Sequence, residues 1–255
     1  MNRAMLFLMS ILLMGVFENV GLEASNARWW HWYFPDGTVD KGHIDPKVFW
    51  DKYGLPPDMT GKRFYDLGCW DGGTCFEAVA RGAKEVYGLD SFVWEVAPQN
   101  YLNFCYARDR IAPNVKDDFV EIEPVPLYKR VGEYKELPNK HTIESFAKKR
   151  GTADVVLAAG IVYHLVDPIK FLRDLKSLVT PDTGLVYVTT WCTRDAGAVA
   201  HFRPGWRNDS TNFWVFSINC MVGLLNQLGY KVHRVQELGH EKEPLVSFIC
   251  SVPRE

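Results

Sequence analysis

A glycine-rich segment at residues 64–73 carries the residues best suited to hold a cofactor; its sequence is Phe-Tyr-Asp-Leu-Gly-Cys-Trp-Asp-Gly-Gly. An apolar strand is expected before it and a helix after it, and such a turn presents backbone amides to a ligand. A dinucleotide-binding loop needs a second glycine where its backbone approaches the pyrophosphate. Trp70 occupies that position here, so the sequence disfavours NAD and FAD.

S-adenosylmethionine (SAM) has no pyrophosphate and avoids this clash. Its cationic groups suit Asp66 at the strand end, and its carboxylate suits amides at the helix start. Asp90 ends the next expected strand, where a carboxylate is placed to accept hydrogen bonds from ribose hydroxyls. The expected SAM-binding residues are Asp66, Gly68, Cys69, Trp70, Asp71, Gly72, Asp90, Ser91 and Gly160.

Tyr163 and His164 follow an expected central strand, at the edge where α/β sheets place their active sites. Transfer of a methyl group to a hydroxyl needs a base, and His164 has a suitable ordinary pKa for that role. Alternatively, His164 only braces the loop, because an acceptor that is already nucleophilic needs no base. Tyr163 is expected either to pack on the cofactor or to orient the acceptor.

Aromatic and basic residues elsewhere are candidates for contact with the acceptor. The aromatic run at residues 29–34 either closes over the site and stacks on a planar substrate or packs as a hydrophobic clasp on the sheet. The basic residues at 129–130 and 148–150 either meet phosphates or are ordinary solvated charges. The loop that follows the strand expected at residues 184–191 should lie at the rim of the site. The candidate substrate residues are Trp32, Arg203, Arg207 and Trp214.

Apolar runs of strand length alternate with amphipathic helices from residue 62 onward, which predicts an α/β, Rossmann-like sheet with helices on both faces. The last two strands are expected to form an antiparallel pair at the sheet edge, and prolines and charges mark residues 124–152 as an insertion. The expected strands are 63–67, 85–89, 119–122, 154–159, 184–191, 231–237 and 245–252. The expected helices are 73–82, 92–111 (restarting near Pro98), 168–179 and 217–228.

The composition is that of an ordinary globular protein of 255 residues, with 47% hydrophobic and 24% charged side chains. Lys and Arg total 29 against 31 Asp and Glu, and this net charge of -2 argues against a protein that mainly coats nucleic acid. The six cysteines form no C-x-x-C pair and no Cys/His cluster with zinc-like spacing. We therefore expect no metal, and buried thiols in a reducing compartment.

The N-terminal apolar run at residues 5–17 is shorter than the ~20 residues of a membrane span. Three interpretations are open. The run is the core of a signal peptide, or it is a helix that packs on the domain or lies on a membrane surface. Alternatively, translation begins at Met14, and most of the run is not part of the protein. We favour a cytoplasmic protein over a membrane-associated or secreted one. The expected divisions are residues 1–27, an N-terminal helical and aromatic cap at 28–61, and a SAM-binding domain at 62–255.

Residues 66–72 and 88–90 resemble motif I and its acidic partner in class I SAM-dependent methyltransferases. Residues 50–63, 160–168 and 212–217 are similar to segments of the tRNA wobble-uridine 5-methoxy/5-carboxymethoxyuridine methyltransferase-like family, and the resemblance covers roughly residues 45–237. It implies SAM as the donor and a tRNA wobble-uridine oxygen as the acceptor. A small hydroxylated or amine metabolite as acceptor, and a SAM-binding protein without catalysis, remain alternatives.

Two departures from that family affect the interpretation. Its carboxymethylating members carry a cationic side chain just before the tryptophan that corresponds to Trp50, whereas this chain has Phe49 there, with Lys47 nearby. The resemblance therefore implies methyl transfer from ordinary SAM. The insertion at 124–152 obscures the residue that would meet adenine, for which Glu121, Glu123 and Glu144 are the candidates.

Overall fold

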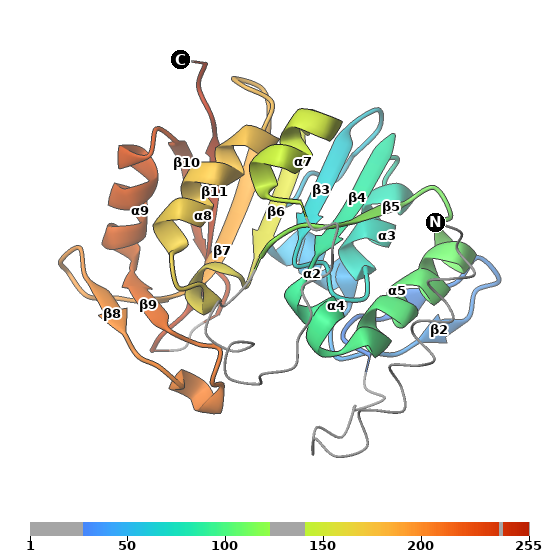
Figure 1. The fold of residues 1–255 in the computed structure, drawn as a ribbon, viewed down its shortest axis with the longest axis horizontal. Helices are drawn as coiled ribbons and strands as arrows, with labels where there is room; N and C mark the ends of the chain where they lie inside the picture. The colour runs from blue at the N-terminus through green and yellow to red at the C-terminus, as the bar shows by residue number, and fades with distance from the viewer. Residues whose placement is uncertain (1–27, 123–140, 240–241, 255) are drawn as a thin grey trace.

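The computed structural model describes residues 28–122, 141–239 and 242–254, and one central sheet organises them (Figure 1). The central strands run parallel to one another, and among the strands of the described ranges only β11 is antiparallel to both of its neighbours. The predicted fold class and the predicted C-terminal pair are therefore confirmed. In spatial order the strands are β10 (Lys231–Glu237), β11 (Leu245–Ser251), β7 (Leu185–Thr193), β6 (Val155–Ala159), β3 (Arg63–Leu67), β4 (Glu85–Asp90) and β5 (Lys116–Phe119).

Helices cover both faces of the sheet because side chains of the central strands alternate between two apolar layers. In β3, Phe64 lies in one layer and Tyr65 in the other. The layer of Phe64 includes side chains of α2 (Pro46–Lys52), α3 (Gly73–Ala80) and α5 (Pro98–Ile111). The layer of Tyr65 includes side chains of α7 (Ile143–Arg150), α8 (Pro168–Leu175) and α9 (Ile218–Gln227).

Several helix boundaries follow capping residues in the sequence. The Asp167 carboxylate accepts a hydrogen bond from the Lys170 amide at 2.8 Å where α8 begins. The Ser217 hydroxyl accepts one from the Cys220 amide at 3.0 Å where α9 begins. The expected helix at 92–111 consists of α4 (Phe92–Val96) and α5, with the break at the proline as predicted.

Two predicted elements were wrong. β5 begins at Lys116 rather than at residue 119, because this strand lies at the sheet edge and its first three residues are polar, so they carry no apolar signal. The segment after β7 was expected to be a loop, but it contains β8 (Ala200–Phe202) and β9 (Trp214–Ser217). These two strands pair antiparallel, and β9 also pairs with the end of β7.

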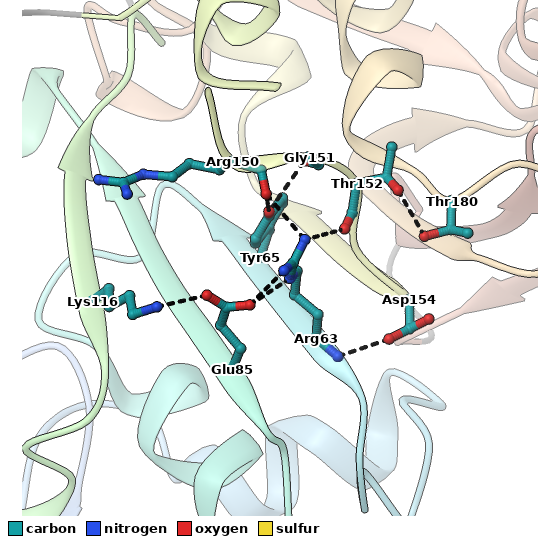
Figure 2. A network of polar contacts seen from close by, with 9 residues as sticks. All are labelled: Arg63, Tyr65, Glu85, Lys116, Arg150, Gly151, Thr152, Asp154 and Thr180. Carbon is teal, nitrogen blue, oxygen red and sulfur yellow. Dashed lines mark hydrogen bonds and ion pairs between the residues drawn. The ribbon is translucent and has the colours of Figure 1, made fainter. Parts of the chain in front are cut away.

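A polar network fixes the amino-terminal ends of the parallel strands (Figure 2). The Arg63 guanidinium donates to Glu85 at 2.6 Å and to the carbonyl oxygens of Arg150 and Thr152 at 3.0 Å each. Lys116 donates to the other Glu85 oxygen at 2.6 Å. The network therefore joins three neighbouring strands and the segment before β6. Its place at the amino-terminal edge leaves the opposite edge for the active site.

The N-terminal part of the described chain packs on the layer of Phe64. It contains a two-stranded hairpin, β1 (Trp32–Tyr33) and β2 (Val39–Asp40), followed by α2. Trp30 and Trp32 are buried in that layer, as a hydrophobic clasp would be. The apolar run at 5–17 and most of the expected insertion lie outside the described residues. No helix among those described is long and apolar enough to cross a membrane.

Candidate active site

Asp66 and Asp90 lie at the carboxyl-terminal ends of two neighbouring parallel strands, β3 and β4. Asp90 accepts hydrogen bonds from the amides of Trp70 at 3.1 Å and Ser91 at 2.7 Å. Asp66 accepts hydrogen bonds from the Thr74 hydroxyl and, at 3.6 Å, from the thiol of Cys75. The strand, glycine loop, helix and second acid predicted from the sequence are therefore assembled in one place.

The two carboxyl groups are almost completely buried, with exposed fractions of 3% for Asp66 and 2% for Asp90. Burial raises the pKa of Asp66 to about 7 and that of Asp90 to about 6. Within the described residues, neither carboxylate forms an ion pair with Lys or Arg. A cationic group would stabilise the ionised form of Asp66, and donating hydroxyl groups would stabilise that of Asp90, so the two acids fit the positively charged groups and the ribose of SAM.

Two glycines of the loop are required by its geometry. Gly68 has φ +71°, and a Cβ atom there would lie 3.3 Å from the Ile161 side chain. Gly72 has φ +86°, and a Cβ atom there would lie 2.7 Å from the Phe104 ring. Side chains at these positions are therefore disfavoured both by conformation and by space. Gly160, at the end of β6, also has a positive φ of 74°.

Trp70 adopts the left-handed conformation, with φ 56°, which is uncommon for a residue with a side chain. Its indole stacks on that of Trp29, with ring centroids 4.8 Å apart. Its carbonyl oxygen accepts a hydrogen bond from the Trp94 indole at 2.6 Å. The backbone thus takes the conformation that a glycine would take, and contacts on both sides hold it there.

Three residues expected to bind the cofactor use their side chains for contacts within the protein. Cys69 is buried, and burial raises the pKa of its thiol. The Ser91 hydroxyl accepts a hydrogen bond from the Ile122 amide at 3.0 Å, which joins the ends of β4 and β5. The Asp71 carboxylate accepts hydrogen bonds from the amides of Trp29 and Trp30. These three side chains are therefore engaged within the protein, and their contact with a cofactor stays a prediction.

His164 ends a short helical turn, η1 (Val162–His164), after β6. Its Nδ1 atom lies 2.7 Å from the Thr211 hydroxyl, and that hydroxyl donates to Asp209 at 2.6 Å. Since the hydroxyl hydrogen points to Asp209, Nδ1–H donates to the hydroxyl oxygen, and the basic lone pair is on Nε2. Burial lowers the pKa of His164, and the negative charge of Asp209 opposes that shift.

Tyr163 lies beside His164 in the same turn. A Cβ atom on Gly160 would lie 3.4 Å from its hydroxyl, so the side chain folds back over the end of β6. Burial raises the pKa of Tyr163 to about 12, and the hydroxyl therefore keeps its proton at neutral pH. The Tyr163 carbonyl also accepts a hydrogen bond from the Phe213 amide at 2.9 Å, which ties the turn to the segment before β9.

The candidate substrate residues lie in different surroundings. The Arg207 guanidinium lies 3.7 Å above the Trp191 ring and close to Trp206, and its charge acts on Tyr163. Arg203 forms an ion pair with Glu243.

The two candidate tryptophans pack within the protein. Trp32 is buried and its indole donates to the Asp71 carbonyl at 3.3 Å. Trp214 packs between Phe202 and Phe216. Arg207 is thus the candidate whose charge acts on Tyr163, whereas Trp32 and Trp214 have packing contacts.

Sequence reasoning missed Asp209, Thr211 and Trp191. The Asp-Ser-Thr sequence at 209–211 is typical of a turn in which Asp bonds the chain two residues on, and the Thr211 amide does donate to Asp209 at 2.8 Å. The turn at residues 209–211 was therefore predictable from the sequence. Nothing in the sequence could show that this turn meets His164, because the two are 47 positions apart. Trp191 lies near the carboxyl-terminal end of β7, where a site residue could have been suspected.

The three candidates for contact with adenine lie in different parts of the chain. Glu121 follows β5, and its amide donates to the His141 carbonyl at 2.8 Å. Glu144 lies in the first turn of α7. Glu123 lies outside the described residues. The choice among the three stays a prediction.

A family model described as a methyltransferase domain matches residues 50–235, which is most of the chain. The chain belongs to the methyltransferase domain family. It is 27% identical, over 176 residues, to the tRNA U34 carboxymethyltransferase of Idiomarina loihiensis, with 68% of this chain and 47% of that protein covered. It is also 25% identical, over 192 residues, to the tRNA U34 carboxymethyltransferase of Saccharophagus degradans, with 74% of this chain and 50% of that protein covered. The chain therefore spans about half the length of these curated relatives.

Solved structures resemble this methyltransferase domain in fold. A SAM-dependent methyltransferase from Mesorhizobium loti superposes with a TM-score of 0.53 at 14% identity, covering 80% of this chain and 96% of that one. The cyclase SpnF gives a TM-score of 0.56 at 13% identity, covering 90% and 89%. The predicted methyltransferase family and the Rossmann-like fold are confirmed. Since a cyclase shares the fold, the fold alone does not decide the reaction.

Proposed function

We propose that this protein is a SAM-dependent methyltransferase that methylates an oxygen of a tRNA wobble uridine. The observation that carries the donor assignment is the pair of buried acids, Asp66 and Asp90, which have no cationic partner among the described residues and flank a glycine-rich loop. SAM supplies a methyl group on a positively charged sulfur. Asp90 would hold the ribose hydroxyls, and Asp66 with the loop would hold the amino-acid portion.

His164 and Tyr163 are the catalytic candidates for a hydroxyl acceptor. His164 takes the acceptor proton at Nε2, while Thr211 and Asp209 hold the Nδ1 side of the ring. Tyr163 keeps its proton and donates it in a hydrogen bond that orients the acceptor. This division of roles uses the tautomer that the Thr211 contact favours.

Phe49 supports transfer of a methyl rather than a carboxymethyl group. It is buried, its ring stacks on Tyr53 with centroids 3.6 Å apart, and Trp30 packs against its edge. An apolar stack of this kind offers no charge to a donor carboxylate. The relatives named as carboxymethyltransferases would then differ from this protein in the group transferred.

The tRNA acceptor rests on the names of those relatives and on the sequence resemblance. One observation favours a small metabolite as a second candidate: Arg203 and Arg194, on the segment after β7, form ion pairs with Glu243 and Glu237. Such pairs reduce the positive charge available to a phosphate backbone. The six free thiols and the use of SAM support a cytoplasmic location.

Calorimetric titration with S-adenosylhomocysteine tests the donor site. The wild type should bind, and Asp90→Ala should weaken binding strongly; a wild type that does not bind would refute the proposal. Incubation with methyl-labelled SAM and tRNA lacking the wobble modification tests the acceptor. Label in the wobble nucleoside supports tRNA, and label only in a small-molecule fraction of an extract supports the second candidate.

A further inference from the structure

The segment at residues 28–34, here called the strap, is fixed to the donor loop through Asp71. The two Asp71 carboxylate oxygens accept hydrogen bonds from the backbone amides of Trp29 at 3.0 Å and Trp30 at 3.2 Å. The Asp71 carbonyl accepts a third hydrogen bond, from the Trp32 indole. Asp71 is completely buried, so these contacts replace water for a group that would otherwise be costly to bury.

The strap also fits the loop by shape. A Cβ atom on Gly73, the first residue of α3, would lie 2.4 Å from the Trp30 side chain. The absence of a side chain at Gly73 therefore makes the space that Trp30 fills. One residue earlier in the strap, the Trp29 indole stacks on Trp70 with an interplanar angle of 19°.

These contacts lead to the acid expected to hold the ribose. Trp29 packs on Trp70, Trp70 is held with φ 56°, and in that conformation its amide donates to Asp90 at 3.1 Å. We propose that Asp71 and Trp29 are positioning residues for the methyl donor: they hold the strap on the loop, and the strap holds Trp70 where it orients the Asp90 carboxylate. The inference rests on the proposed function, because it concerns the same donor site.

The experiment compares binding of S-adenosylhomocysteine by the wild type, Trp29→Ala, Trp29→Phe and Asp71→Asn, using calorimetry on the full chain. Trp29→Ala should raise Kd by about two- to tenfold, the value of one aromatic pair, and Trp29→Phe should restore most of the affinity because it keeps a stacking ring. Asp71→Asn should also raise Kd, because it replaces one of the carboxylate oxygens that hold the strap. Asp36→Asn is the matched control, since Asp36 is exposed and, among the residues that the structure describes, its carboxylate accepts hydrogen bonds from Thr38 two positions on.

Steady-state kinetics separate positioning from general damage to the fold. In Trp29→Ala the KM for SAM should rise while kcat stays near that of the wild type, and the unfolding temperature without ligand should fall little. Equal Kd values in the wild type and Trp29→Ala would overturn the inference alone. Failure of the wild type to bind would overturn the proposed function and the inference together. If Asp71→Asn does not fold, the two Trp29 variants, which keep the buried carboxylate, still decide the question.

Discussion

The Thr211 hydroxyl lies 2.7 Å from Nδ1 of His164 and connects the turn before β9 to the loop after β6. Removing it in Thr211→Val should lower kcat/KM by about tenfold, a part of the ~10²–10⁴-fold that a positioned base contributes. The expected cause is loss of the hydroxyl contact to Nδ1 and of its link to Asp209, which leaves the ring held by the Thr211 carbonyl, 3.2 Å from Nδ1. Measurement of kcat/KM against pH should also show an altered apparent pKa.

Thr211→Ser is the matched control for this prediction, because it keeps the hydroxyl and should retain most of the activity. Binding of S-adenosylhomocysteine should be unchanged in both variants. A Thr211→Val enzyme with the wild-type pH profile would show that His164 braces the loop without acting as a base.

Donor binding should strengthen as pH rises through the range of about 6 to about 7. Asp66 and Asp90 have pKa values raised to about 7 and about 6 in the protein without donor, so both lose their protons in that range. SAM favours the ionised acids, so its binding should release protons. Calorimetry with SAM in buffers of different ionisation enthalpy measures that release, and it should decrease in Asp90→Asn. An affinity for SAM that is independent of pH would contradict the assignment.

The same raised pKa values make the donor-free fold less stable as pH rises. In the unfolded chain these acids ionise near pH ~4, so the folded state holds protons that the unfolded state has already released. The free energy of unfolding should therefore fall between about pH 4 and about pH 7. Saturating SAM should reduce this fall, which denaturant titrations at several pH values would measure.

Arg63→Met should lower the free energy of unfolding by about 1–3 kcal/mol. The substitution removes the guanidinium that donates to the carbonyl oxygens of Arg150 and Thr152 and to one carboxylate oxygen of Glu85. Arg254→Met is the control, because its ion pair with Asp182 is largely exposed and should contribute about 0.5 kcal/mol or less. Urea denaturation measures both, and an equal effect of the two substitutions would refute the structural role of the network.

Gly73→Ala should destabilise the protein by about 1–3 kcal/mol, because the added methyl group meets the Trp30 side chain. Gly223→Ala, within α9, provides the opposite case. A Cβ atom there meets nothing within 4 Å, and alanine should stabilise the helix by about 0.5–1 kcal/mol. Thermal unfolding of the two variants compares them, and a neutral Gly73→Ala would show that Trp30 moves aside freely.

The sequence was sufficient to predict the parallel sheet, because the buried strands are continuous apolar runs and the helices begin at capping residues such as Asp167 and Ser217. Asp66 and Asp90 were also predictable, since each ends a strand next to a turn. β5 was misplaced because an edge strand has little apolar signal. The hairpin β8–β9 was missed because only two short strands define it.

The site was less predictable than the fold where contacts join distant segments. Asp71 stands in the glycine loop and was expected to bind the cofactor, yet its carboxylate bonds the strap 41 and 42 positions earlier. Trp70 was interpreted as an obstacle to a pyrophosphate, and the structure adds that its indole has a partner in Trp29. Pattern and spacing along the chain contain no information about such pairings.

Because Trp30 fills the space beside Gly73, a substitution at either position constrains which residues fit at the other. Homologues with a larger residue at position 73 should carry a smaller one at position 30, so an alignment would show the two changing together. The same holds for protein engineering: a chimera that takes its N-terminal segment from another family member would need the matching glycine loop from the same parent.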